Sequence, residues 1–551
     1  MNTDLETSEG SNTRGLRDLI TCSFITGRDF YSYELLKNER GMMIREILKS
    51  NSRRYPNRNA IIYKDIRYTF EEFNSRVNRL ANALTTMGLS KGDWVAMVAD
   101  DCAEHVELFW AGAKVGIATS ALNPAFSERD FSHLIGNGKA AAVVCSHKYC
   151  NLVESLRPTL ESVKGYITLG PSRKGFVGYE DLISTSSSVE PDVEIDENNL
   201  LYFANTSGTT GLSKQVMHTH KSLLATALMD LDVMDYDMSA GGASLIGGPH
   251  FWAYLLPRIT IPCFYMGCTL VIPPNLTPQG FLQAIEKEKV TNLTTGTAFL
   301  QQIMDYHDLD KYDYSSLRRI FIFGYYPPEV WRRAVELFGN IFVVGYGLSE
   351  IGLITFLPPE DFIFDGPPEK VKRLKSCGRE GLCVDARVVD DQGEDVQPGQ
   401  VGEIIAKGPD IMKGYWNAPD ATAQTVRGGY VYTGDLATVD EEGYIYLAGR
   451  KKDSITTQGK MVLPSEIEEI ILQHPQVVDA AVIGLPDEKL GEAIKAVVVK
   501  REGELTGEEI IMLCRQNLPG FAVPRSVEFV ETLPKTASGR VQRYKIREKY
   551  L

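Results

Sequence analysis

The stretch LYFANTSGTTGLSKQVMHTHKSLL, Leu201 to Leu224, crowds hydroxyls and glycines in front of one lysine, Lys214. An apolar run of helical character, containing His218 and His220, follows it. Successive backbone N–H groups in a glycine-rich loop form a concavity for anions, and hydroxyls add donors for phosphate oxygens. The stretch therefore predicts a phosphate site, although the same composition also suits a flexible surface loop. Its spacing breaks the GxxxxGK[ST] pattern, which argues against a P-loop NTPase.

Bulk properties limit the class of protein around this loop. A chain of 551 residues suggests two or more domains, and its apolar, charged and aromatic fractions of 43%, 24% and 9% are those of a soluble globular protein. The formal charge of −14 argues against general nucleic-acid binding and against adhesion to anionic membranes, because both need a basic face.

The cysteines and the apolar segments favour an intracellular protein. Nine cysteines have no zinc spacing, so reduced and mostly buried thiols are expected. The polar stretch MNTDLETSEGSNTRG at the start indicates no signal peptide. The most apolar segment, Ile259–Pro274, is interrupted by glycine and proline and is too short for a membrane span, so we predict core strands there. We expect a cytoplasmic location.

Periodicity predicts strands that alternate with helices. Thr69 and Glu72 form a capping box, and the helix after it carries one apolar face and ends at Gly88. That face comprises Phe73, Val77, Leu80, Ala81 and Leu84. Buried strands are predicted at residues 94–99, 140–146, 318–324 and 340–347. The alternation indicates parallel sheets covered on both faces.

The last third of the chain has a different pattern. Short β segments with turn signals begin near Ser376 and suggest a barrel-like or meander region. A smaller α/β segment follows Gly449, in which Pro464 opens a helix with an apolar face, two strands follow, and the chain ends in a basic tail. We place the boundary at Arg450–Asp453.

Further motifs now make the opening loop recognisable. Tyr346–Glu350 reads YGLSE, Val401–Thr422 reads VGEIIAKGPDIMKGYWNAPDAT, and Tyr432–Asp435 reads YTGD. GRKKD at Gly449–Asp453 and LPKTASGR at Leu533–Arg540 complete the series. Together these motifs resemble, in the same order, those of the adenylate-forming superfamily, which comprises acyl- and aryl-CoA synthetases, luciferases and peptide-synthetase adenylation domains. The resemblance runs from about Met42 to the C-terminus.

The resemblance implies an α/β fold with a large N-terminal domain and a small one. The large domain would combine two stacked α/β subdomains with a β-barrel-like subdomain, and the small C-terminal domain would be a mobile α+β unit. The expected divisions are an N-terminal extension at 1–40, the large ATP- and acyl-binding domain at 41–450, a hinge at 451–453 and the C-terminal domain at 454–551.

The implied chemistry has two steps: a carboxylate attacks the α-phosphate of ATP, and the thiol of coenzyme A then displaces AMP. The β- and γ-phosphates would be held by Thr206, Ser207, Gly208, Thr209, Thr210, Gly211 and Lys214. Glu350 would hold Mg²⁺, although a solvated loop carboxylate is its alternative reading. Ser349 replaces the family threonine, and its hydroxyl can still donate to the α-phosphate.

The remaining assignments also follow the family pattern. Tyr346 would stack on adenine, and Asp435 and Arg450 would hold the ribose, unless these two form only a surface salt bridge. Lys452 matches the hinge at which the C-terminal domain rotates. Gly459 matches the glycine of the coenzyme A tunnel, whereas Gln458 departs from a common second glycine, which narrows the expected thiol route.

The terminal motif contains the most informative departure. Arg540 stands where the family has its adenylation lysine, and Lys535 matches an earlier, less critical lysine. Arginine keeps a positive charge and can bridge carboxylate and phosphate in a bidentate manner, so we favour Arg540 as the catalytic group. The alternatives are that Lys535 or Lys545 substitutes, that adenylation is slow, or that the basic tail is only a solvated terminus.

Aromatic side chains define the predicted acyl pocket. It would be lined by His250, Phe251, Trp252, Gly324 and Tyr325. Large rings would shorten the cavity, so the pocket fits an apolar aryl, alicyclic or short-to-medium acyl group. The alternative is that these aromatics only pack the core.

The leading hypothesis is thus an AMP-forming acyl- or aryl-CoA ligase, with ATP, Mg²⁺, coenzyme A and a small carboxylic acid as its ligands. Two alternatives stay open: an adenylation enzyme that loads a carrier protein, and a nucleotide-binding pseudoenzyme, which the departures at Arg540, Gln458 and Gln215 motivate. A homodimer is compatible with the sequence, which does not fix the oligomeric state.

Overall fold

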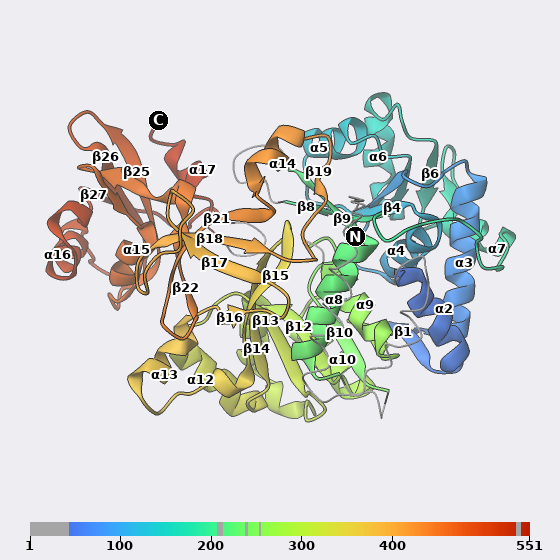
Figure 1. Cartoon of the computed structure of the whole chain (residues 1–551), viewed down its shortest axis with the longest axis horizontal. Helices are drawn as coiled ribbons and strands as arrows, with labels where there is room; N and C mark the ends of the chain where they lie inside the picture. Colours follow the sequence, from blue (N-terminus) through green and yellow to red (C-terminus); the bar gives the residue numbers. More distant parts are fainter. Residues whose placement is uncertain (1–42, 207–212, 237–240, 253–254, 536–540) are drawn as a thin grey trace, which may run out of the picture.

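A computed structural model describes residues 43–206, 213–236, 241–252, 255–535 and 541–551 (Figure 1). The N-terminal extension expected at 1–40 lies outside these ranges. Four sheets organise the described residues: two large ones, an antiparallel one and a C-terminal one. Figure 1 shows the C-terminal sheet at the left, away from the two large sheets.

The first large sheet has eight strands, and most of its neighbouring strands are parallel. Its order is β19 (Gly414–Tyr415), β9 (Gln215–Thr219), β8 (Leu200–Asn205), β4 (Ala118–Ala121), β3 (Trp94–Val98), β5 (Ala142–Cys145), β6 (Gly165–Thr168) and β7 (Val177–Gly178). The edge strands β9 and β19 run antiparallel to their neighbours. The helices of this half are α2 (Ile44–Arg54), α3 (Phe70–Thr86), α4 (Ala103–Val115), α5 (Glu128–Phe131), α6 (Cys150–Leu156) and α7 (Tyr179–Thr185).

The second large sheet has nine strands around a parallel centre. Its order is β16 (Arg379–Glu380), β15 (Ile351–Leu357), β14 (Phe342–Leu348), β13 (Arg319–Phe323), β12 (Asn292–Gly296), β10 (Ala243–Gly247), β11 (Thr269–Ile272), β1 (Asn59–Tyr63) and β2 (Ile66–Thr69). Its helices are α8 (His220–Met234), α9 (Leu255–Tyr265), α10 (Pro278–Glu288), α11 (Thr297–Met304), α12 (Pro328–Phe338) and α13 (Pro368–Lys372).

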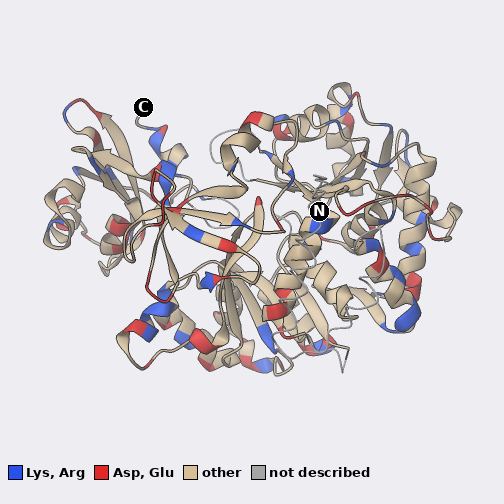
Figure 2. Cartoon of the chain, in the orientation of Figure 1, with Lys and Arg blue, Asp and Glu red and all other residues tan. Residues whose placement is uncertain are grey.

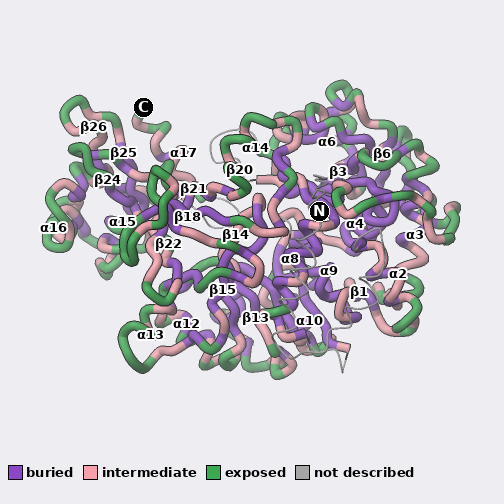
Figure 3. The backbone as a smooth tube through the Cα atoms, in the orientation of Figure 1, coloured by how far each residue is buried: buried purple, intermediate pink, exposed green. Residues whose placement is uncertain are grey.

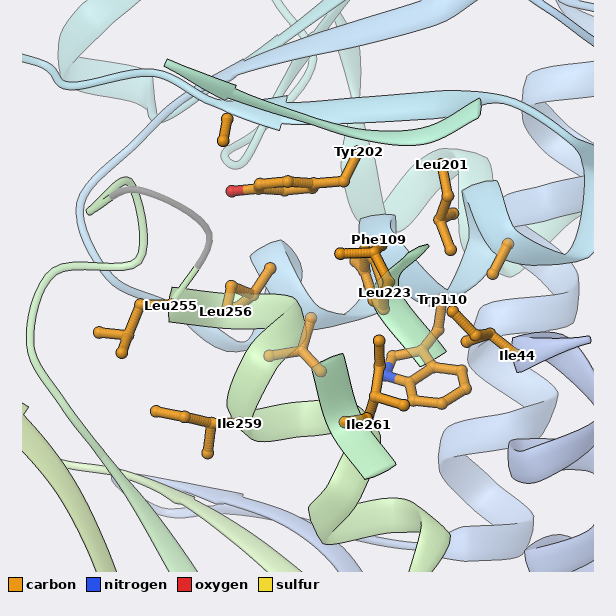
Figure 4. Packing of buried hydrophobic residues seen from close by; sticks show 14 of the residues in the cluster. Ile44, Phe109, Trp110, Leu201, Tyr202, Leu223, Leu255, Leu256, Ile259 and Ile261 are labelled. Atoms are coloured by element: carbon orange, nitrogen blue, oxygen red, sulfur yellow. The ribbon is translucent and has the colours of Figure 1, made fainter. Parts of the chain in front are cut away.

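Helices α8 and α9 join the two large sheets into one core. Helix α8 contacts β9 of the first sheet and β13 and β15 of the second, while α9 contacts α4 and β10. Figure 4 shows how Phe109 and Trp110 of α4 lie among Tyr202, Leu223 and Ile261, which come from β8, α8 and α9. The hydrophobic side chains between these elements are almost completely buried, as the purple segments of Figure 3 show. This shared core fixes β9 relative to β14 and β15.

The two smaller sheets follow in the sequence. The third consists of β17 (Asp385–Val389), β18 (Gly402–Lys407), β21 (Tyr430–Val439) and β20 (Val426–Arg427), with β22 (Ile445–Arg450) paired to β21, and α14 (Pro419–Thr425) precedes β20. The fourth consists of β24 (Lys460–Val462), β23 (Ile455–Thr457), β26 (Gly491–Lys500) and β25 (Val477–Asp487), with β27 (Ser526–Phe529) paired to β26. Its helices are α15 (Pro464–Leu472), α16 (Gly507–Asn517) and α17 (Arg543–Arg547). A 3₁₀ turn at Lys451–Asp453 connects the two sheets.

Several local predictions are confirmed. The capping box of Thr69 and Glu72 is present, and all five residues of the predicted apolar face of α3 are buried. The region after Ser376 is antiparallel β structure, as its turn signals indicated. Basic and acidic residues are interspersed along the ribbon in Figure 2. Within the described ranges, no helix is long and apolar enough to cross a membrane.

Two local predictions are wrong. The segment Ile259–Pro274 is not a pair of core strands: its first part belongs to α9 and only its second part forms β11. A helix buried on all sides is apolar throughout, so its periodicity resembles that of a buried strand. The run after Lys214 begins as the strand β9, which contains His218, and turns helical only at His220.

A buried charge cluster lies beside α8 and α9. Arg258 of α9 donates to Asp230 of α8 at 2.6 Å and lies over the rings of Phe321 and Phe323. Asp410 is fully buried, and burial raises its pKa from 3.8 to about 7, against the attraction of Arg258. Burial also raises the pKa of Asp230 to about 6. Arg258 thus pairs directly with Asp230 and attracts the Asp410 carboxylate only electrostatically.

This cluster predicts a pH-dependent stability. Because the folded state holds the Asp410 proton more tightly than the unfolded state, the contribution of this carboxyl group to the free energy of unfolding should fall as the pH rises from about 4 to about 7. We expect Asp410→Asn, which carries no charge, to be more stable than wild type at pH 8 by up to about 4 kcal/mol, and the two proteins to converge near pH 4. Urea unfolding across this range measures the difference. The prediction would be contradicted if the difference in unfolding free energy between Asp410→Asn and wild type did not change with pH. It would also be contradicted if this difference equalled the one caused by Asp65→Asn, which changes an exposed carboxylate.

Candidate active site

The opening stretch forms the connection of the β8–β9 hairpin. Its base is closed by two hydrogen bonds: Thr206 N–H donates to the Lys214 carbonyl at 3.0 Å, and Lys214 N–H donates to Thr206 Oγ1 at 3.1 Å. The strands behind it are in antiparallel register. The predicted phosphate ligands Ser207, Gly208, Thr209, Thr210 and Gly211 lie outside the described residues.

The tip between β14 and β15 lies beside this hairpin. The carbonyl of Ser349 accepts a hydrogen bond from His218 Nε2 at 2.9 Å, and the Glu350 carbonyl accepts from Met412 N–H at 2.8 Å. The carboxylate of Glu350 accepts from the Tyr415 hydroxyl at 2.6 Å. The Lys214 ammonium lies 4.7 Å from the centroid of the same ring. Tyr415 therefore connects Lys214 with Glu350.

The residues predicted to bind adenine and ribose also contact one another. The Tyr346 hydroxyl donates to Asp435 Oδ2 at 2.7 Å, and Arg450 Nε pairs with Asp435 Oδ1 at 2.7 Å. Asp435 and Arg450 are cross-strand partners in β21 and β22, so the third sheet sets their spacing. The Thr433 hydroxyl accepts from Asp435 N–H at 3.0 Å, which fixes the turn before the carboxylate.

The residues around Glu350 and those around Asp435 form one continuous set, because Tyr346 lies on β14 close to the β14–β15 tip that contains Glu350. Contacts lead from Lys214 through Tyr415 to Glu350, and from Tyr346 to Asp435 and Arg450. Residues that the sequence predicts to bind phosphate, Mg²⁺ and ribose therefore lie around the tip between β14 and β15.

Burial fixes the protonation states of this set. It raises the pKa of Tyr415 and of Tyr346, and the carboxylates of Glu350 and Asp435 raise them further. Both phenols thus stay protonated and donate to their carboxylates. Burial lowers the pKa of His218 to about 4, so its imidazole is neutral near pH 7 and donates from Nε2 to the Ser349 carbonyl.

Sequence reasoning missed Tyr415 and His218. Tyr415 lies in the quoted GYWN segment, but only β19 reveals its role: Gly414 pairs with Met217 and Tyr415 with Val216, which brings the ring beside Lys214. No local pattern marks His218, since its partner is 131 positions away in the sequence.

The predicted acyl residues divide between two loops. His250 is buried, its backbone N–H donates to Asp101 at 2.7 Å, and burial lowers its pKa to about 3. The Trp252 ring packs on Gly296, where an added Cβ would lie 2.5 Å from the indole. Phe251 is half-buried, Gly324 follows β13 with φ +117°, and Tyr325 is 49% exposed.

The C-terminal assignments follow the third sheet in the sequence. Lys535 pairs with Asp479 of β25 at 2.6 Å, and Arg540 lies outside the described residues. Lys452 lies in the 3₁₀ turn between the two smaller sheets. Gln458 and Gly459 form the exposed tip of the β23–β24 hairpin with φ of +52° and +71°, and no atom of the described residues lies within 4 Å of a Cβ added at Gly459.

A cleft of about 790 Å³ opens elsewhere, where β15 and β16 meet the third sheet. None of the predicted site residues that the structure describes lines it.

Tyr415→Phe tests the link between Lys214 and Glu350. Phenylalanine keeps the ring under the lysine but leaves the Glu350 carboxylate without this donor, so we expect about a tenfold rise in the Kd of Mg·ATP. Calorimetric titration measures it. Tyr430→Phe, which removes a hydroxyl bonded to Asp385 on the third sheet, serves as the control and should leave the Kd unchanged.

Comparisons with known proteins identify the family of this chain. The model of the AMP-binding enzyme family matches residues 48–416, and that of the AMP-binding enzyme C-terminal domain matches residues 466–540. The chain therefore belongs to the AMP-binding enzyme family, the adenylate-forming superfamily, and is an AMP-forming acid–thiol ligase.

Individual relatives are similar along nearly the whole chain. A feruloyl-CoA synthase of Amycolatopsis sp is 30% identical over 91% of this chain and 97% of its own length. A long-chain-fatty-acid–CoA ligase of Salmonella typhimurium is 28% identical, covering 91% and 94%. The crystal structure of ATP-bound MatB from Rhodopseudomonas palustris superposes with a TM-score of 0.81 at 26% identity, covering 92% and 99%. The ATP-bound neighbour and the family match support ATP as the nucleotide.

Proposed function

We propose that this protein joins a small apolar carboxylic acid to coenzyme A, with ATP cleaved to AMP and pyrophosphate. The observation that carries the proposal is the convergence of Lys214, Glu350, Tyr346, Asp435 and Arg450 around the β14–β15 tip. A single ATP molecule needs cationic, metal-binding, aromatic and ribose-binding groups within its own length, and these residues offer each of them.

In this proposal each residue acts on one part of ATP. Lys214 and the loop from Thr206 to Gly211 hold the departing pyrophosphate, where negative charge accumulates. Tyr346 contacts adenine, and Asp435 accepts from the ribose hydroxyls through lone pairs that Tyr346 and Arg450 leave unused. The Ser349 hydroxyl donates to the α-phosphate.

Glu350 would hold Mg²⁺. Among the described residues no cluster of three or more His, Cys, Asp or Glu could hold a metal alone. A lone carboxylate nevertheless suits Mg²⁺, which commonly uses one or two carboxylates and completes its shell with water and nucleotide phosphates. When bound, the ion would neutralise charge that develops on the phosphates. The hydrogen bond from Tyr415 orients the Glu350 carboxylate for this purpose.

The acyl group is proposed to lie beside Trp252 and the C-terminal ends of β12 and β13. The indole packed on Gly296 occupies space that a long acyl chain would need, and no carboxylate or lysine lies in residues 250–254 or 324–326. These features favour an aryl, alicyclic or short-to-medium acid. The thiol step would use the turn at Lys452 and the exposed Gln458–Gly459 tip after rotation of the C-terminal domain.

A panel of acids tests the proposal. Benzoate-like, cyclohexane-like and straight C4–C10 acids should support AMP formation that depends on coenzyme A, whereas activity with long-chain acids alone would contradict the assigned pocket. Acid-dependent ATP–pyrophosphate exchange separates an enzyme from a pseudoenzyme, since a binding-only protein would bind nucleotide without exchange. Exchange without transfer to coenzyme A would instead favour loading of a carrier protein.

A further inference from the structure

The tip that carries Ser349 and Glu350 is not held by its own hairpin. Leu348 pairs with Ile351, so two residues form the connection, and such connections usually adopt turns with a positive φ. Neither Ser349 nor Glu350 has a positive φ. The ladder is also irregular just before the tip, with register shifts on both sides of Gly347. The conformation of this tip therefore depends on contacts from outside.

Three donors from other segments supply those contacts. Met412 N–H and the Tyr415 hydroxyl, both from the segment around β19, bind the carbonyl and the carboxylate of Glu350. His218 Nε2 on β9 binds the carbonyl of Ser349. Among these donors only His218 holds Ser349, and it stands four residues after Lys214 on the strand that leaves the phosphate loop.

We propose that His218 is a positioning residue that fixes the Ser349 hydroxyl and the Glu350 carboxylate relative to β9 and the adjoining Lys214. Its ring is fully buried, so water cannot readily replace the hydrogen bond if the side chain is removed. The tip would then lose its connection to β9 while the contacts from Met412 and Tyr415 remain. The inference rests on the proposed nucleotide site.

The test compares His218→Leu with His218→Gln. Glutamine can place an amide N–H near the position of Nε2, whereas leucine fills the space without a donor. We expect His218→Leu to raise the Kd of Mg·ATP about tenfold and to slow ATP–pyrophosphate exchange, and His218→Gln to recover most of both. Attack of coenzyme A on chemically prepared acyl-adenylate should be slowed clearly less than exchange, because the adenylate keeps the α-phosphate beside Ser349 but no longer carries the β- and γ-phosphates.

A second buried histidine provides the control. His220 is equally buried at the start of α8, and neither ring nitrogen has a hydrogen-bond partner within the part of the chain that the structure describes. His220→Leu should leave the Kd of Mg·ATP unchanged. The inference is overturned if His218→Leu binds Mg·ATP like wild type, if it slows both half-reactions equally, or if His218→Gln with wild-type thermal stability fails to recover binding. Failure of wild type itself to bind Mg·ATP would instead overturn the proposed function.

Discussion

Glu350→Gln is expected to lower the rate of adenylate formation by two to three orders of magnitude (about 10²–10³-fold). Glutamine keeps an oxygen that can accept from Tyr415, so the tip should retain its conformation, but it removes the negative charge that would hold Mg²⁺. The phosphate charges that build up in the transition state would then lack their counterion. ATP–pyrophosphate exchange at saturating acid measures the effect.

The dependence on Mg²⁺ makes this test specific. The variant should need a much higher concentration of Mg²⁺ for half-maximal exchange, while its thermal unfolding stays close to that of wild type. Glu369→Gln, which changes an exposed carboxylate on α13, should leave both quantities unchanged. Exchange in Glu350→Gln at the wild-type rate and Mg²⁺ requirement would remove Glu350 from the proposed metal site.

Arg540→Ala is expected to suppress adenylate formation by about a hundredfold or more while sparing the second half-reaction. Arg540 occupies the position of the family's adenylation lysine, where a positive charge would bridge the attacking carboxylate and the α-phosphate. After the adenylate has formed, the bond between the carboxylate and the α-phosphate already exists, so the Arg540 charge is no longer needed to promote its formation. Single-turnover assays with acid plus ATP, and separately with prepared acyl-adenylate plus coenzyme A, measure the two steps.

Neighbouring basic residues separate this role from its alternatives. Lys535 already pairs with Asp479, so we expect Lys535→Ala to affect adenylation much less than Arg540→Ala. Arg540→Lys keeps the charge and should recover part of the rate. Equal loss in both half-reactions, or a larger loss in Lys535→Ala or Lys545→Ala, would contradict the assignment of Arg540.

The sequence alone predicted the kind of fold because its signals are local. The capping box of Thr69 and the apolar face of α3 depend on residues within a few turns, and both are present. The segment Ile259–Pro274 was misread because complete burial removes the polar face that distinguishes a helix from a strand. The motifs suggested the proposed nucleotide-binding residues by their order along the chain, but that order contains no information on the distances between them.

The supporting residues of the site could not be found in this way. Tyr415 reaches Glu350 only because β19 pairs with the edge strand β9, and His218 reaches Ser349 only because α8 and α9 pack the two large sheets together. Such pairings join remote parts of the chain, so no spacing in the sequence announces them. The acyl assignment stays a prediction: Tyr325 is half-exposed, and the indole of Trp252 fills the space beside Gly296.

The docking of β19 on β9 has a consequence for biosynthesis. After β9 has been synthesised, the ribosome has to translate nearly two hundred further residues before β19 with Tyr415 can pair with it. The strand β22 with Arg450 is synthesised later still. The proposed nucleotide site is therefore completed only after β22 has been synthesised. Contacts between remote segments form slowly because a long loop must close first. Binding of ATP should accordingly serve as a late reporter of maturation, absent from fragments that stop before β22.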